Sequence, residues 1–196
     1  MTLRVHMTER SVSELGFGRR FVIWCQGCCK GCPGCVAQEA QPLDGGREVE
    51  TAALAWEIIL ALRSGYCKGL TISGGEPTLQ CGALCDLLDR VSAKTDTGVV
   101  LYSGYTYEEL KKRPDAAALL SRCDVLIDGE YISAKDDGMA LRGSSNQRVF
   151  LLTERYRDSL DTYQGKRRPD ARSVPYGCET HYIGIPPHTS GEEELQ

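Results

Sequence analysis

The chain has 196 residues, of which 41% are hydrophobic and 26% charged, and its formal net charge is −4. This composition predicts a soluble globular protein with enough chain for one domain, and the negative charge gives no reason to expect a nucleic-acid partner. No apolar run approaches the ~20 residues of a membrane span and the N-terminus lacks the apolar segment of a secretory signal, so we expect no membrane association and a cytoplasmic location.

Strand and helix patterns alternate from the N-terminus onward. Residues 3–7 and 20–24 are short apolar runs that predict strands, and residues 48–63 repeat apolar side chains at helical spacing. The apolar face expected for this helix consists of Val49, Ala52, Ala53, Trp56, Ile59 and Leu60.

The alternation continues through the middle of the chain. Residues 69–73, 98–102, 124–128 and 148–153 predict four more strands. Residues 79–91 predict a helix, and residues 107–121 predict a second one that Pro114 interrupts, because proline cannot donate an interior hydrogen bond. The inward face expected for the first of these helices consists of Leu84, Leu87, Leu88 and Val91.

This pattern predicts an α/β fold built from parallel βα units. Four to six units are too few for a closed eight-stranded barrel, so a partial, open TIM-like barrel with helices outside is expected. We assign residues 1–153 to this domain. From Glu154 onward the periodicity is lost, and residues 154–196 are expected to form a partly disordered C-terminal extension, either docked or flexible, that ends in a disordered SGEEELQ.

Cysteines are the unusual feature of the composition. The chain has ten, and five of them lie between positions 25 and 35. In a chain of this size without a secretory signal, crowded cysteines indicate metal binding or redox chemistry rather than disulfides.

The spacing of these cysteines leaves several sites open. The overlapping CxxC pairs are too tight for two zinc knuckles, whereas Cys28, Cys32 and Cys35 offer three thiolates to a [4Fe–4S] cluster and leave one iron without a protein ligand. The amino and carboxylate groups of S-adenosylmethionine could chelate that iron, and its reductive cleavage would give methionine and a 5′-deoxyadenosyl radical. A structural zinc site or reactive surface thiols remain possible. We expect Cys25 to be a core residue and Cys29 to be a spare thiol within the loop.

Further motifs follow this cysteine loop in a recognisable order. Together they resemble the radical S-adenosylmethionine superfamily, and within it the activating proteins of anaerobic (class III) ribonucleotide reductase. The matching stretches are GFGRR at 16–20, QGC at 26–28, CPGC at 32–35, SGGEP at 73–77, YSGY with EEL at 102–110, DVLIDG at 124–129 and RGSSNQR at 142–148.

The resemblance implies roles for the strand-end residues. Gly74, Gly75 and Glu76 would hold the methionine part of the cofactor, with Glu76 accepting from its ammonium group. The loop of Ser103, Gly104 and Tyr105 would lie by the ribose and carboxylate, and Asp128 by the ribose or adenine. Backbone groups at Gly34, Cys35 and Val36 would hold the adenine. Ordinary turns and a packed tyrosine are the competing interpretations, and Asn146 and Gln147 are expected to be structural.

The same resemblance implies an activase that installs a glycyl radical on a large protein partner and takes electrons from a donor such as flavodoxin or ferredoxin. A self-contained radical enzyme acting on a small molecule, nucleotide or peptide is the alternative. A non-catalytic iron–sulfur or zinc module is a third hypothesis, which the SGGEP motif after the cysteine loop disfavours.

Three departures from the family pattern stand out. Val36-Ala37-Gln38 replaces the usual asparagine after the last cysteine, Phe17 replaces a proline, and the chain continues well beyond RGSSNQ. In that continuation Cys178, His181 and His188 form a loose C-x2-H-x6-H array. Its spacing is irregular, so scattered polar residues are a better interpretation than a second metal site.

Overall fold

The computed structural model describes residues 1–163, 165–167, 169–176 and 179–185. Its core is one seven-stranded sheet with strand order β3-β1-β2-β4-β5-β6-β7. The strands are β1 (Thr2–Val12), β2 (Arg20–Cys25), β3 (Arg47–Glu50), β4 (Gly69–Gly74), β5 (Gly98–Ser103), β6 (Val125–Asp128) and β7 (Arg148–Leu151). The main helices are α1 (Thr51–Arg63), α2 (Cys81–Ser92), α3 (Tyr107–Lys111), α4 (Pro114–Leu120) and α5 (Arg157–Tyr163).

The centre of the sheet is parallel. Strands β2, β4, β5 and β6 pair in parallel, whereas β1 and β3 add antiparallel strands at one edge and β7 adds one at the other. The expected α/β class is confirmed, and the described strands form an open sheet rather than a closed barrel. All four parallel strands direct their carboxyl ends to one rim, where ligand sites form in such sheets.

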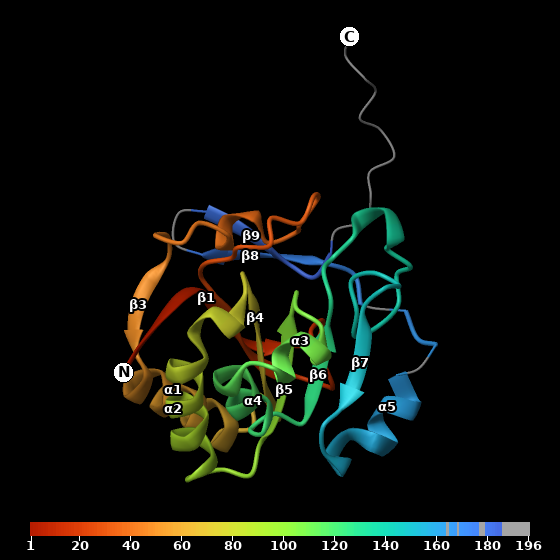
Figure 1. Ribbon diagram of the computed structural model, residues 1–196. Coiled ribbons are helices and arrows are strands. Elements are labelled where there is room, and N and C mark those ends of the chain that lie inside the picture. Colours follow the sequence, from red (N-terminus) through yellow and green to blue (C-terminus); the bar gives the residue numbers. More distant parts are fainter. Residues whose placement is uncertain (164, 168, 177–178, 186–196) are drawn as a thin grey trace.

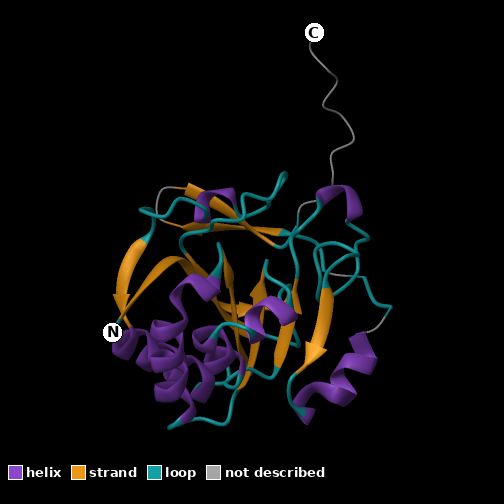
Figure 2. Ribbon diagram, viewed as in Figure 1, coloured by secondary structure: helices purple, strands orange, loops and turns teal. Residues whose placement is uncertain are grey.

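Helices α1 to α4 cover one face of this sheet (Figure 2), whereas α5 packs near Val100, Val125 and Ile127 on the other face. Side chains alternate along each strand, so Phe21, Ile23 and Cys25 of β2 join the core beneath the helices, whereas Val22 and Trp24 face the opposite side. The inward face expected for α2 is confirmed by the burial of Leu84, Leu87, Leu88 and Val91.

Two predictions about the region of α1 are wrong. Residues 47–50 pair with β1 as strand β3 instead of starting the helix. The buried face of α1 also differs, because Trp56 and Leu60 remain 58% and 50% exposed. This helix is apolar nearly all round, so periodicity could not single out the stripe that packs on the sheet. The residues actually buried are Thr51, Leu54, Ala55, Ile58, Ile59 and Ala61.

The last strand of the sheet also differs from a parallel βα unit. Strand β7 runs antiparallel to β6, with Leu126 opposite Phe150. The connection between them is a long loop with one short 3-10 turn, Ser133–Lys135, and contains no α-helix. Without a crossover helix, the chain returns beside β6 in the antiparallel sense.

The described part of the extension packs on the face that helices α1 to α4 leave open (Figure 1). A two-stranded hairpin, β8 (Arg172–Tyr176) and β9 (Glu179–Ile183), places Val174 and Ile183 against Met7, Val22 and Trp24. The terminal SGEEELQ, expected to be disordered, lies outside the described residues, as do Cys178 and His188 of the C-x2-H-x6-H array. Among the helices of the described residues, none has the length and apolar character to cross a membrane.

Candidate iron–sulfur site and cofactor cavity

The cysteine loop leaves the carboxyl end of β2 and is tied back to the chain by backbone hydrogen bonds. Gly27 N–H donates to the Ala40 carbonyl at 2.8 Å, and Cys28 N–H donates to the Gln41 carbonyl at 2.9 Å. Gly27 has a φ of +99°, a conformation that side chains disfavour. These bonds close the loop on itself and fix both of its ends.

Three thiols of this loop line one cavity. Cys28, Cys32 and Cys35, called the cluster cysteines below, are all partly exposed and all contribute to its wall. Burial raises the pKa of Cys32, and the neighbouring Glu130, Cys35 and Cys28 add to the rise. Mutual proximity of three thiols with solvent access suits ligands that lose their protons when a metal binds.

The other two cysteines between positions 25 and 35 do not belong to the cluster cysteines. Cys25 is fully buried in the core beneath the helices, and burial raises the pKa of its thiol far above the usual value. Cys29 is exposed and is absent from the cavity wall. These positions agree with the predictions that Cys25 is a core residue and Cys29 a spare thiol.

The glycines after β4 bring a second loop against the cysteine loop. A Cβ on Gly74, whose φ is +107°, would lie 2.4 Å from the backbone nitrogen and oxygen of Cys25. A Cβ on Gly75 would lie 2.4 Å from the Gly27 carbonyl oxygen. Glycine is therefore needed at both positions for the two loops to touch.

Glu76 is a buried carboxylate at the floor of the cavity. Its side chain is 1% exposed, and Oε1 accepts hydrogen bonds from Thr78 N–H (3.0 Å), Thr78 Oγ1 (2.6 Å) and Ser103 Oγ (2.9 Å). Oε2 accepts from Gly104 N–H at 2.8 Å. Four donors fix this carboxylate in place, and its position on the cavity wall lets it face a positively charged ligand group.

The cavity itself has a volume of about 520 Å³. This volume lies within the range of small-molecule and cofactor sites, roughly 300–1,000 Å³. Residues singled out from the sequence that line it are Cys28, Cys32, Cys35, Val36, Gly74, Gly75, Glu76, Ser103 and Gly104.

Three of the residues expected to contact the cofactor lie elsewhere. Gly34 lines a second hollow, which Cys28 and Cys32 also line. Tyr105 lies under the Lys30 ammonium, with Nζ 4.2 Å from its ring centroid. Asp128 is buried and accepts hydrogen bonds from Tyr107 N–H at 2.6 Å and from Arg148 at 3.0 and 2.5 Å. Their contacts with a cofactor stay predictions.

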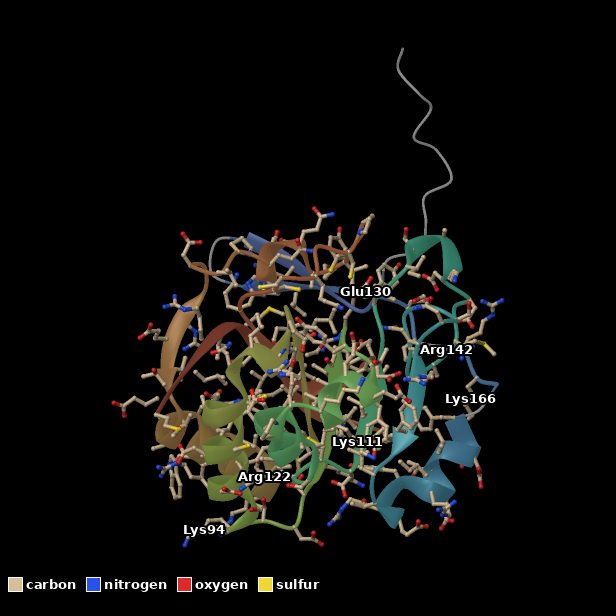
Figure 3. The ribbon with its side chains drawn as sticks, in the orientation of Figure 1. Lys94, Lys111, Arg122, Glu130, Arg142 and Lys166 are labelled. Carbon is tan, nitrogen blue, oxygen red and sulfur yellow. The ribbon has the colours of Figure 1, made fainter. Side chains whose placement is uncertain are left out.

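The loop between β6 and β7 closes another side of the cavity. Gln147 Nε2 donates to the Gly129 carbonyl, and Asn146 Nδ2 donates to the Glu130 carbonyl, both at 2.8 Å. These bonds fit the structural role expected of the two amides. Arg142, labelled in Figure 3, lines the cavity, and its buried Nε has no hydrogen-bond partner among the described residues.

Several residues that line the cavity were not predicted from the sequence. Lys30 lies inside the cysteine loop and pairs with Glu130 (labelled in Figure 3) at 2.8 Å, which joins this loop to the one after β6. Pro169, Thr180 and Tyr182 reach the cavity from the extension. The position of Lys30 between the cluster cysteines is visible in the sequence and could have indicated a role. The contacts of the extension depend on tertiary packing, so no local pattern indicates them.

The residues present fit an iron–sulfur cluster with a bound small molecule. The cluster cysteines supply three soft thiolate ligands, which suit iron–sulfur chemistry. Gly74, Gly75 and Gly104 line the cavity beside them, and the Arg142 Nε–H and the Glu76 carboxylate offer a hydrogen-bond donor and an acceptor to a zwitterionic ligand.

Comparison with known proteins agrees with this chemistry. The family described as "4Fe-4S single cluster domain" matches residues 15–150. The anaerobic ribonucleoside-triphosphate reductase-activating protein of Vibrio cholerae is 35% identical over 144 residues, covering 70% of this chain and 91% of the relative. That of Enterobacteria phage T4 is 30% identical, covering 71% and 88%.

A more distant relative has a different partner in its name. The pyruvate formate-lyase-activating enzyme of Clostridium pasteurianum is 29% identical, covering 75% of this chain and 60% of the relative. The match with the family extends over the cysteine loop, the SGGEP motif and the strand-end loops. The chain therefore belongs to the 4Fe-4S single cluster domain family, among the radical S-adenosylmethionine activating proteins.

Proposed function

We propose that this protein is an activase that installs a glycyl radical on a partner enzyme such as anaerobic ribonucleotide reductase. When bound, the cluster supplies one electron to S-adenosylmethionine, giving methionine and a 5′-deoxyadenosyl radical that takes a hydrogen atom from a backbone glycine. The observation that carries this proposal is a single cavity lined by the cluster cysteines, Gly74, Gly75 and the buried Glu76.

Each group of the chain has a separate part in this proposal. The cluster cysteines would hold three irons and leave the fourth open to the amino and carboxylate groups of S-adenosylmethionine. Glu76 would accept a hydrogen bond from that amino group, and Gly104 keeps the Glu76 carboxylate in place through the 2.8 Å bond. Arg142, which pairs with Asp137 at 2.5 Å, would donate its remaining Nε–H to the ligand's carboxylate.

The remaining parts of the proposal concern the setting of this site. The open sheet would act as a partial TIM-like barrel in residues 1–153, with residues 154–196 as an extension. The partner would present its glycine loop at the open rim, and flavodoxin or ferredoxin would supply the electron. The protein would work in the cytoplasm, where a reducing environment keeps thiols such as the cluster cysteines available.

A second candidate function is a self-contained radical enzyme that acts on a small molecule, nucleotide or peptide. One observation favours it: Pro169, Thr180 and Tyr182 of the extension line the cavity together with the cluster cysteines. An extension that narrows the cavity could complete a pocket for a small substrate. The glycine loop of a partner enzyme would need a wider opening.

The test begins with the cofactor. After anaerobic reconstitution we expect about four irons per chain, and dithionite with S-adenosylmethionine should release 5′-deoxyadenosine. Bound zinc without any cleavage would overturn both candidate functions.

The second step separates the two candidates. The reduced enzyme is mixed with a class III ribonucleotide reductase, with pyruvate formate-lyase, or with no partner. A glycyl radical signal in electron paramagnetic resonance with the reductase supports the proposal. Deoxyadenosine release without a radical on either protein favours the self-contained enzyme.

A further inference from the structure

A second group of metal-binding side chains lies beside the iron–sulfur site. It consists of His6 on β1, Glu39 in the 3-10 turn Gln38–Ala40 that ends the cysteine loop, and His181 on β9 of the extension. Their candidate ligand atoms all lie within 4.8 Å of one another. Three segments far apart in the sequence therefore meet at one point, and we call these residues the His-Glu-His cluster.

The geometry of the cluster suits a small divalent cation. Glu39 Oε2 lies 2.9 Å from His181 Nδ1 and 3.9 Å from His6 Nε2. Four ligands about 2.0 Å from a tetrahedral zinc ion stand about 3.3 Å apart. The two observed separations bracket this value, so small side-chain rotations would bring the three atoms onto one ion.

Burial and charge also favour a metal over a simple ion pair. His181 is only 8% exposed although it belongs to an outer hairpin, and its ring lies edge-on to that of His6 with centroids 5.3 Å apart. Neutral imidazole is the form that binds metals, and the carboxylate supplies a negative charge between the two rings.

We propose that His6, Glu39 and His181 bind a divalent transition-metal ion, with zinc as the expected metal, that fastens the extension to the cysteine loop. Two histidines and one glutamate form a known zinc ligand set. The nitrogen and oxygen ligands here differ from the three thiolates of the neighbouring site, which suit an iron–sulfur cluster.

The position of this ion gives it a structural consequence. All three residues line the same cavity as the cluster cysteines. Figure 1 shows the β8–β9 hairpin lying across the loop that follows β2, and the ion would join the two. Bound metal would hold the extension as a wall of the cavity, and loss of the metal would release it.

The first test measures the metal in the reconstituted holoenzyme purified in zinc-containing buffer. We expect about one zinc besides about four irons per chain, with X-ray absorption at the zinc edge showing only nitrogen or oxygen neighbours near 2.0–2.1 Å. Zinc with sulfur neighbours near 2.3 Å, or no bound zinc, overturns the proposal. A fifth iron that has nitrogen and oxygen neighbours supports the site and overturns only the choice of zinc.

Variants identify the ligands. His181→Ala and Glu39→Gln should each weaken zinc binding at least about 100-fold, since losing even an outer partner of a ligand typically costs 10–100-fold. Iron content should stay unchanged. Glu57→Gln is the matched control, because this carboxylate pairs with Arg10 on a different surface. Should His181→Ala fail to fold, Glu39→Gln still allows the test, because the Glu39 side chain is 68% exposed. Unchanged zinc affinity in Glu39→Gln overturns the assignment.

Limited proteolysis tests the fastening. Trypsin can cut the extension at Lys166, Arg167 and Arg172. We expect zinc to slow this cleavage in the parent protein and to have no effect in Glu39→Gln. Equal cleavage rates with and without zinc in the parent protein would show that the ion, if bound, does not hold the extension.

Discussion

The two ends of the parallel sheet carry similar sequence signals but differ in structure. At the carboxyl end, the cluster cysteines, Gly74, Gly75 and Glu76 surround a cavity open to solvent. At the amino end, Arg20 is completely buried and hydrogen-bonded to oxygen atoms of the neighbouring strands. Glycines and a charged residue thus line an open cavity at one end and form a closed structural joint at the other.

Arg20 organises the amino end through five hydrogen bonds. Its Nε donates to Thr71 Oγ1 at 2.6 Å, and one terminal nitrogen donates to the carbonyls of Leu70 (2.6 Å) and Gly98 (2.8 Å). The other terminal nitrogen donates to the Phe17 carbonyl and to the Tyr156 hydroxyl. The arginine therefore joins β2, β4 and β5 where these strands begin.

The extension also reaches this end, which explains one departure from the family pattern. Phe17, which stands where proline is usual, stacks on Tyr156 at 4.6 Å between ring centroids and meets Tyr163 edge-on at 5.1 Å. Gly18 N–H donates to the Tyr163 hydroxyl at 2.9 Å. An aromatic residue at position 17 thus gives the extension a surface to pack against.

The largest expected effect is at the carboxyl end. Cys32→Ala removes one of three iron ligands, so the cluster should not assemble and deoxyadenosine release should fall below detection. Iron analysis and chromatography of the products measure this. Cys29→Ala is the matched control and should keep four irons, because that thiol is absent from the cavity wall. Iron retention in Cys32→Ala would remove the distinction between the two thiols.

At the amino end, the expected effect is on stability. Arg20→Met leaves several buried acceptors without their donor, which should cost about 3–5 kcal/mol in the free energy of unfolding. For a chain of this length, that lowers the melting temperature by roughly 10 °C. Arg19→Met, at an exposed position, should change it little. A normal melting temperature combined with lost S-adenosylmethionine cleavage would place chemistry at this end as well.

Glu76→Gln should act on binding rather than on the cluster. Loss of the charge should weaken S-adenosylmethionine binding about 10–100-fold, from a charged hydrogen bond worth about 1.5–3 kcal/mol. Equilibrium dialysis measures the affinity, and iron content should be unchanged. Glu109→Gln, in the N-terminal cap of α3, is the control and should bind normally. Unaltered affinity in Glu76→Gln would mean that its four donors make Glu76 purely structural.

The smallest expected effect separates the extension from the chemistry. Tyr156→Phe removes the hydroxyl that accepts from Arg20 at 2.9 Å, which should cost about 1 kcal/mol and lower the melting temperature by about 2–4 °C. Cleavage of S-adenosylmethionine per cluster should not change. Tyr66→Phe, on an exposed side chain, is the control. A changed cleavage rate would show that the amino end communicates with the cavity.

The sequence alone determined the α/β class and the positions of the central strands. It also indicated that the cysteine loop and the loops after the strands lie close together. This was possible because β-branched runs, glycine turns and cysteine spacing are local signals. The burial of Leu84, Leu87, Leu88 and Val91 on α2 followed from its clear periodicity. On α1, which is apolar on most sides, the same reasoning chose the wrong face.

Only the tertiary structure decided features that depend on contacts between distant segments. The edge strand β3 forms because β1 offers a free edge, and residues 47–50 alone show no such partner. Asp128 is held by Arg148 and Tyr107 N–H instead of lining the cavity. His181 meets His6 and Glu39, which no sequence spacing indicates. Long-range pairing is set by packing of the whole chain, so local patterns can suggest ligands but cannot choose their partners.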